Sequence, residues 1–216
     1  MGVKRVLRWQ HPGAYPGRQD FETLGAALES LKGSNRRRWA AACQGMRVMQ
    51  GQEDAASVRE AAKAKEVYMV TFSSDADAVF LVMRQERQII RAERSIRELL
   101  EKVNMLKQRF MLYFEGWQCS LGDFVVKLGK ATQKPNDEFK GIVMEVDYLP
   151  LASPQQAQHV LKEFVEILQA ATTSAGGRLE LVSAPLAEYP LPERFGMEHT
   201  AVLYTALCSS LLSQAR

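Results

Sequence analysis

Two carboxylates two residues apart, Glu145 and Asp147, are the residues of this sequence that come nearest to a reactive pair. They lie in the segment GIVMEVDYLP, residues 141–150, where apolar side chains at every second position predict a β-strand. Side chains two apart on a strand project from one face, so inside a barrel both acids could hold a divalent cation against a polyphosphate. This chemistry gives an alternative function, a barrel enzyme that acts on a polyphosphate.

The same strand has a simpler interpretation as a core strand. The positions that alternate with the two acids are apolar: Ile142, Met144, Val146 and Tyr148. Because the apolar face of a strand normally faces the core, we expect Glu145 and Asp147 to point to solvent. The tunnel-type triphosphatases use a Glu-x-Glu-x-Lys strand, but Leu149 occupies the Lys position here and no second such strand occurs. We therefore expect no catalytic and no metal-binding residue.

Other residue types that carry chemistry are scattered. The histidines are His11, His159 and His199, and none has a second ligand at a metal-site spacing. The Gly129-Lys130 pair resembles the end of a phosphate-binding loop, but Phe124 replaces its first glycine and Ala131 its Ser or Thr. Neither a GxSxG nor a GxGxxG motif occurs. The sequence therefore predicts no cofactor.

Basic residues form two groups in a chain whose net charge is only +3 over 216 residues. One group is the run Arg36-Arg37-Arg38. The other comprises Arg84, Arg87, Arg91, Arg94 and Arg97, with glutamates between its members. Nucleic-acid binding would require these cations on one surface among stacking aromatic residues. We expect a solvated, charge-balanced surface and no direct sequence-specific binding of nucleic acid, with contact through Arg36–Arg38 kept as a third hypothesis.

Three cysteines, Cys43, Cys119 and Cys208, are odd in number and form no CxxC pair. This usage is typical of reduced, mostly buried thiols in an intracellular protein. The longest apolar run, Ala78 to Met83, is far too short to span a membrane. We expect a soluble protein without a membrane partner.

Residues 108–150 predict three long strands whose second faces are also apolar. The side chains on those second faces are Met111, Tyr113, Trp117, Val125 and Val143. An antiparallel sheet that faces water on one side should be polar there. These five residues are therefore expected either beneath helices of this chain or at an interface with a partner.

The remaining elements follow from periodicity and capping signals. Further strands are predicted over Val3–Trp9, Arg38–Val48, Val67–Phe72, Ala78–Arg84, Arg87–Arg91 and Arg178–Ser183, and Gln50–Lys65 is a loose connection. Helices are predicted over 21–31, from capping Ser95, from capping Ser153 to Gly176, and over Met197–Leu212. Strands in runs with a few helices predict an α+β fold. We expect one domain over residues 1–216, a mostly antiparallel curled sheet or a β-barrel of about eight strands with three to four flanking helices.

The segments FEGWQ (114–118), LGDF (121–124), VKLGK (126–130) and GIVMEVDYLP (141–150) follow one another in an order that resembles a known family. The start, Gly2-Val3-Lys4, and the later residues 199–202 fit the same pattern. The family is subunit 20 of Mediator, the coactivator of RNA polymerase II, also called a TATA-binding-protein-related factor, and the plant type is the most similar.

This resemblance implies a β-barrel with flanking helices and no catalytic residues. It also implies a nuclear protein in the Mediator head module, which forms a heterodimer with subunit 18, lies near subunit 8 and acts on RNA polymerase II indirectly. Its role would be to bind and position other proteins so that regulators communicate with the polymerase.

Overall fold

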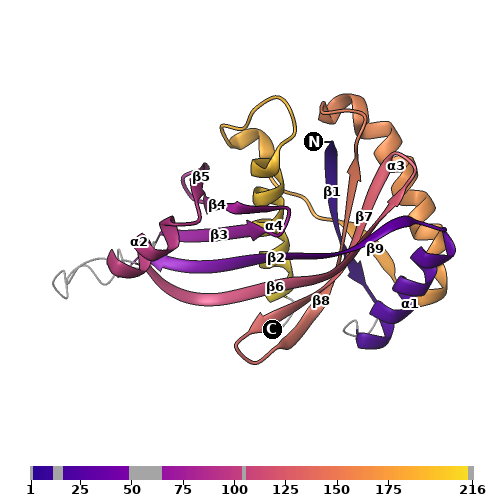
Figure 1. Ribbon diagram of the computed structural model, residues 1–216, viewed down its shortest axis with the longest axis horizontal. Coiled ribbons are helices and arrows are strands. Elements are labelled where there is room, and N and C mark those ends of the chain that lie inside the picture. The colour runs from indigo at the N-terminus through magenta and orange to yellow at the C-terminus, as the bar shows by residue number, and fades with distance from the viewer. Residues whose placement is uncertain (1, 12–16, 49–64, 104–105, 214–216) are drawn as a thin grey trace.

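A computed structural model describes residues 2–11, 17–48, 65–103 and 106–213 of the chain (Figure 1). Its strands are β1 (Val3–Gln10), β2 (Ser34–Val48), β3 (Glu66–Phe72), β4 (Asp75–Met83), β5 (Gln88–Glu93), β6 (Leu106–Leu121), β7 (Phe124–Lys134), β8 (Glu138–Tyr148) and β9 (Arg178–Leu181). Its α-helices are α1 (Arg18–Ser30), α2 (Ile96–Val103), α3 (Pro154–Ala171) and α4 (Met197–Ser213). The α+β class, the antiparallel sheet and the flanking helices are confirmed.

The nine strands form a single sheet in the order β5-β4-β3-β2-β6-β7-β8-β1-β9, in which all neighbours run antiparallel. β5 and β9 end the sheet and do not pair with each other. The sheet is therefore open. Of the two predicted forms, the curled sheet is correct and the closed barrel is wrong.

Helix α4 occupies the inside of the curl. It contacts β1 and β8 in one half of the sheet and β3, β4 and β5 in the other half. Most of its residues are buried, including His199, Tyr204, Leu207 and Leu211, so a single apolar stripe does not describe it. The space that a barrel would enclose is filled by a helix, which explains why the sheet need not close.

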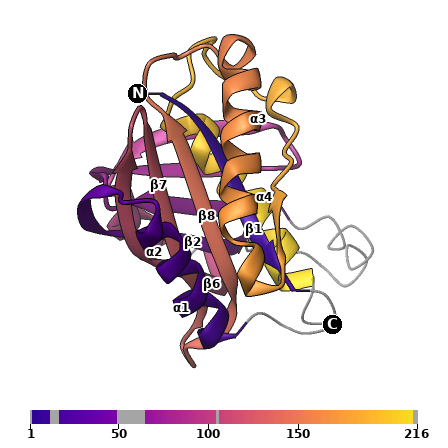
Figure 2. The same cartoon turned by 90° about the vertical axis from the view of Figure 1, so that its right-hand side faces the viewer.

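The opposite face of the sheet carries the other three helices. Figure 2 shows α3 and α1 along the half that contains β1, β7 and β8. Phe164 of α3 stacks on Phe124 of β7, with 3.7 Å between ring centroids. At the other end, Ile96 and Leu100 of α2 pack with the small cluster around Met69. Both faces of the central strands are thus covered, as their doubly apolar pattern predicts.

The structure extends or corrects several predicted elements. β2 starts at Ser34, four residues earlier than expected, and carries the basic run. Ser153 precedes α3, but its hydroxyl oxygen accepts no capping hydrogen bond from the helix, and the hydroxyl instead donates to Oε1 of Gln155 at 3.1 Å. The predicted connection over 50–64 lies outside the described residues. Within the described chain, no helix is both long and apolar enough to cross a bilayer.

Candidate functional site

Glu145 lies at the centre of a buried ionic cluster inside the curled sheet. Its Oε1 accepts hydrogen bonds from Lys127 Nζ at 2.7 Å and from Lys4 Nζ at 3.1 Å. Its Oε2 accepts the hydroxyl of Tyr204 on α4 at 3.0 Å. Lys4 also lies 3.7 Å from Oδ2 of Asp147. Three strands and one helix therefore converge on a single carboxylate.

The prediction that Glu145 and Asp147 point to solvent is wrong. Glu145 is 0% exposed and Asp147 is 9% exposed. The apolar side chains of β8 did not reveal which of its faces is buried, because helices cover both faces and both therefore belong to the core. The face of β8 that carries Glu145 and Asp147 can be buried because each of these acids faces a lysine, and burial of a charge requires such a partner.

The two acids respond differently to this environment. Burial alone would raise the pKa of Glu145, but the charges of Lys127 and Lys4 outweigh it and lower the pKa from 4.5 to about 2. Burial, followed by repulsion from Glu145, raises the pKa of Asp147 against the attraction of Lys4. Burial and the Glu145 charge likewise raise the pKa of Tyr204 well above its ordinary value. Glu145 is thus held as a carboxylate and Tyr204 as a hydroxyl donor.

This donor set does not suit a divalent cation. Both lysines donate to the same oxygen of Glu145, and a cation placed there would add positive charge to two buried ammonium groups. The described residues contain no cluster of three or more His, Cys, Asp or Glu side chains able to hold a metal. With α4 filling the sheet and Tyr204 on Oε2, the geometry gives no support to the polyphosphate alternative.

Sequence reasoning missed Lys4, Lys127 and Tyr204 as the partners of Glu145. A signal for Lys127 exists, because it is a lone charge within the apolar run of β7. Its partner depends on register: Lys127 lies opposite Glu145, and Lys4 lies opposite Asp147. Those pairings join residues far apart in the chain, and a single sequence does not reveal them.

The histidines and cysteines do not come together as a metal site in the described residues. His199 accepts a hydrogen bond at Nδ1 from the Gly196 amide at 3.1 Å and stacks on Phe195, as expected for a residue that caps or packs. His159 is exposed on α3, and its Nδ1 lies 3.6 Å from Oε1 of Glu163 one helical turn on, so the prediction that no histidine has a carboxylate at a ligand spacing is wrong for this residue. Cys43, Cys119 and Cys208 are buried and form no disulfide.

The five predicted interface residues do not share one face of the sheet. Trp117 of β6 lies opposite Leu128 of β7, and Leu128 lies opposite Met144 of β8. These three side chains are on the sheet face that α1 and α3 cover. Val143 belongs to the other parity, which faces α4, and it is fully buried, so it is removed from the predicted surface. Val125 shares that parity and is half-buried. Met111, Tyr113 and Trp117 remain together on β6.

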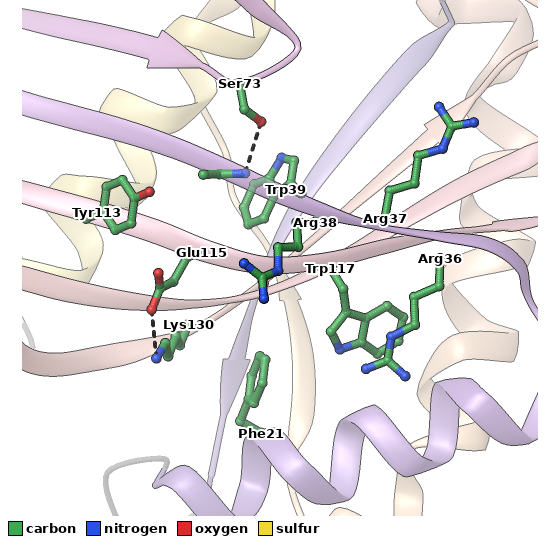
Figure 3. Close-up of a pocket in the computed structure, with 12 residues that line it drawn as sticks. Phe21, Arg36, Arg37, Arg38, Trp39, Ser73, Tyr113, Glu115, Trp117 and Lys130 are labelled. Atoms are coloured by element: carbon green, nitrogen blue, oxygen red, sulfur yellow. Dashed lines mark hydrogen bonds and ion pairs between the residues drawn. The ribbon is translucent and has the colours of Figure 1, made fainter.

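A series of three adjoining hollows follows these three residues across the sheet face between α1 and α2. The largest, of about 740 Å³, is lined by Trp117 and Tyr113 (Figure 3). Tyr113 also lines the second hollow, of about 190 Å³, together with Arg97. Arg97 continues into the third, of about 280 Å³, where Met111 lies. No described helix crosses this face between α1 and α2 (Figure 1).

We call this feature the basic groove. Its basic side chains are Arg36, Arg38, Lys130, Arg94 and Arg97, its aromatic side chains include Tyr113 and Trp117, and its floor includes Ala40 and Ala42. Its first two hollows contain one acidic side chain, Glu115, which pairs with Lys130 at 2.7 Å. Figure 3 shows the guanidinium of Arg38 extending over the hollow, whereas Arg37 points away from it. The third hollow adds a second carboxylate, that of Glu101, and basic side chains outnumber acidic ones along the groove.

Comparison with known proteins shows which family the chain resembles in sequence. The family model of the TATA-binding related factor of subunit 20 of the Mediator complex matches residues 1–204. The chain is 29% identical over 216 residues to Mediator of RNA polymerase II transcription subunit 20b of Arabidopsis thaliana, covering 99% of this chain and 97% of that relative.

Two solved structures have partly similar folds. One is a chain of the Schizosaccharomyces pombe Mediator head module, with TM-score 0.44 and 13% identity, covering 82% of this chain and 97% of that chain. The other is a putative adenylyl cyclase from Hippeastrum, described as having a dominant triphosphatase activity, with TM-score 0.41 and 12% identity over 90% of this chain and 100% of that chain.

Proposed function

We propose that this chain, which belongs to the family of the TATA-binding related factor of subunit 20 of Mediator, is a non-enzymatic docking subunit of the Mediator head module. It pairs with subunit 18, lies near subunit 8 and helps to relay regulatory signals to RNA polymerase II in the nucleus. We further propose that residues 1–216 act as one domain, because the strands form one sheet around one main core cluster.

The observation that carries this proposal is the surface formed by Met111, Tyr113 and Trp117. These side chains are half-buried on one sheet face, and no helix in the described ranges crosses that face between α1 and α2. Aromatic residues, methionine and arginine are the types enriched at protein interfaces. The interior supports the same function, since its one carboxylate pair is neutralised by lysines and covered by α4.

Purification of the tagged chain from nuclei tests the proposal. We expect the other Mediator subunits to be recovered with it in amounts comparable to the bait. The double variant Met111→Glu/Tyr113→Glu should lower that recovery by about fivefold or more, because charged residues at an interface core lose apolar burial.

The control is Ile167→Glu, which places one such charge at an exposed apolar residue of α3. It should leave recovery unchanged, and thermal unfolding should show that each variant is folded. Recovery of the parent chain as a lone monomer would refute the proposal. An equal loss in the α3 control would remove the β6 surface as the interface.

A further inference from the structure

We propose that the basic groove binds an acidic segment of a partner protein, one in which Asp or Glu residues flank an apolar side chain. The inference deepens the proposed docking function, on which it rests for the existence of protein partners. It assigns an occupant to the surface around Tyr113 and Trp117.

Charge complementarity is the first argument. Of the basic side chains of the groove, Arg36 pairs with Glu29 and Lys130 pairs with Glu115. Among the described residues, Arg38, Arg94 and Arg97 have no carboxylate partner. Arg38 lines the first hollow, Arg94 the second, and Arg97 the second and third. Guanidinium groups without a carboxylate partner therefore occur along the whole groove, where they can pair with incoming Asp and Glu side chains.

The position of Arg97 strengthens this argument. Its Nε is buried and has no hydrogen-bond partner in the described chain, although its residue is only half-buried and lines two adjoining hollows. A buried donor without a partner costs free energy until an acceptor satisfies it. A carboxylate bound in the groove would supply that acceptor.

The groove floor accounts for the apolar part of the ligand. Ala40 and Ala42 alternate along β2 beneath the first two hollows, and Tyr113 borders both. Small side chains leave room above the sheet, and Tyr113, Trp117 and Phe21 give the groove apolar, aromatic walls. This arrangement of an apolar floor with a charged rim is typical of sites for short peptide segments.

Single-stranded nucleic acid fits the same groove less well. Base stacking requires free aromatic faces, but Arg36 lies over the Trp117 ring at 4.5 Å and Lys134 lies over the Tyr113 ring at 5.8 Å. We therefore assign the groove to an acidic peptide, and the test includes an oligonucleotide.

The test titrates the full chain against a short fluorescein-labelled peptide in which Asp and Glu alternate with Leu and Phe, read by fluorescence anisotropy. We expect saturable binding that weakens as salt is raised, and no binding of the counterpart peptide that carries Asn and Gln in place of the acids. The double variant Arg38→Glu/Arg94→Glu should weaken binding about tenfold or more. Both arginines are exposed and free to pair with the peptide carboxylates, and the substitutions replace that attraction by repulsion.

Lys162→Glu is the control, because Lys162 is exposed on α3 and lines none of the three hollows. It should change the affinity by less than about twofold. Absence of peptide binding, an equal effect of Lys162→Glu, or tighter binding of oligothymidylate with the same dependence on Arg38 would each overturn the assignment. The two proposals fail separately: a chain that co-purifies with Mediator but binds no acidic peptide refutes only the groove assignment, whereas a monomeric chain that binds the peptide refutes only the docking function.

Discussion

Replacement of Glu145 by Gln is expected to lower the free energy of unfolding by about 3–5 kcal/mol. The variant keeps an acceptor for the hydroxyl of Tyr204, so the loss isolates the charge rather than the shape of the side chain. Lys127 and Lys4 would remain buried, with Asp147 as the nearest carboxylate of Lys4. An uncompensated buried ammonium group is among the most destabilising changes that a folded chain can carry. Urea unfolding measures the effect.

Glu115→Gln is the control for this variant. Glu115 pairs with Lys130 at 2.7 Å, as Glu145 does with Lys127, but its side chain is 44% exposed. Its replacement should cost less than about 1 kcal/mol, because water screens and solvates an exposed pair. Adding Lys127→Met to Glu145→Gln should recover part of the loss, since it removes the ammonium group that is left without its carboxylate. Equal effects of the two Gln variants would contradict the buried cluster.

The same cluster predicts how the effect of Glu145→Gln depends on pH. The pKa of Glu145 is lowered from 4.5 to about 2 in the folded chain, so its stabilising contribution is complete above pH 4.5 and is lost as the pH falls toward 2. The raised pKa of Asp147 acts in the opposite direction, because its protonation favours the folded state as the pH falls. The difference in unfolding free energy between parent and Glu145→Gln should therefore narrow across this window, by about 3 kcal/mol at most. A constant difference would contradict the assigned ionisation.

Replacement of Gly129 by Ala is the second change with a large expected effect, a loss of about 2–3 kcal/mol of unfolding free energy. The six-membered ring of Trp39 lies against Gly129, and a Cβ added there would come within 2.2 Å of that ring. Trp39 is 4% exposed and packed in the main core cluster, so the ring has little room to move away. Thermal or urea unfolding of the variant measures the loss.

Gly25→Ala provides the opposite expectation within the same fold. Gly25 is a buried residue of α1, and a Cβ there would meet the Trp117 ring at an ordinary 3.9 Å. Because alanine favours a helix interior over glycine, this variant should gain about 0.5–1 kcal/mol. Loss of stability in Gly25→Ala, or tolerance of Gly129→Ala, would show that the packing around these two tryptophans differs from that described.

The fold was predictable to the extent that local patterns determine it. Alternation in β6, β7 and β8 and the capping signals before α2 and α3 identified those elements, and the doubly apolar strands correctly indicated cover on both faces. Closure of the sheet was beyond such patterns. It depends on where α4 packs, and because α4 is apolar on all sides, its sequence does not indicate which side faces the sheet.

The candidate site was predictable in part for a related reason. Alternation places Met111, Tyr113 and Trp117 on one face of their own strand, and the structure confirms that they lie together. It does not relate them to Val125 or Val143 on neighbouring strands, because relative faces depend on register. Because the strand register could not be predicted, Lys4 and Lys127 were not identified as partners of Glu145. Glu145 was therefore expected to face solvent, whereas it is the most buried acid of the described chain.

The order of motifs from residue 114 to residue 150 identified the family correctly, although no single motif does so. Membership of Mediator follows from the family, whereas the surfaces that make its contacts remain proposals based on the geometry of β2 and β6.

Co-expression of this chain with Mediator subunit 18, followed by size-exclusion chromatography with light scattering, tests the central claim most directly. If the chain is a docking subunit built around a sealed interior, the two proteins should elute as one species whose mass equals the sum of one copy of each. Separate elution of two monomers, with the chain folded by circular dichroism, would contradict it.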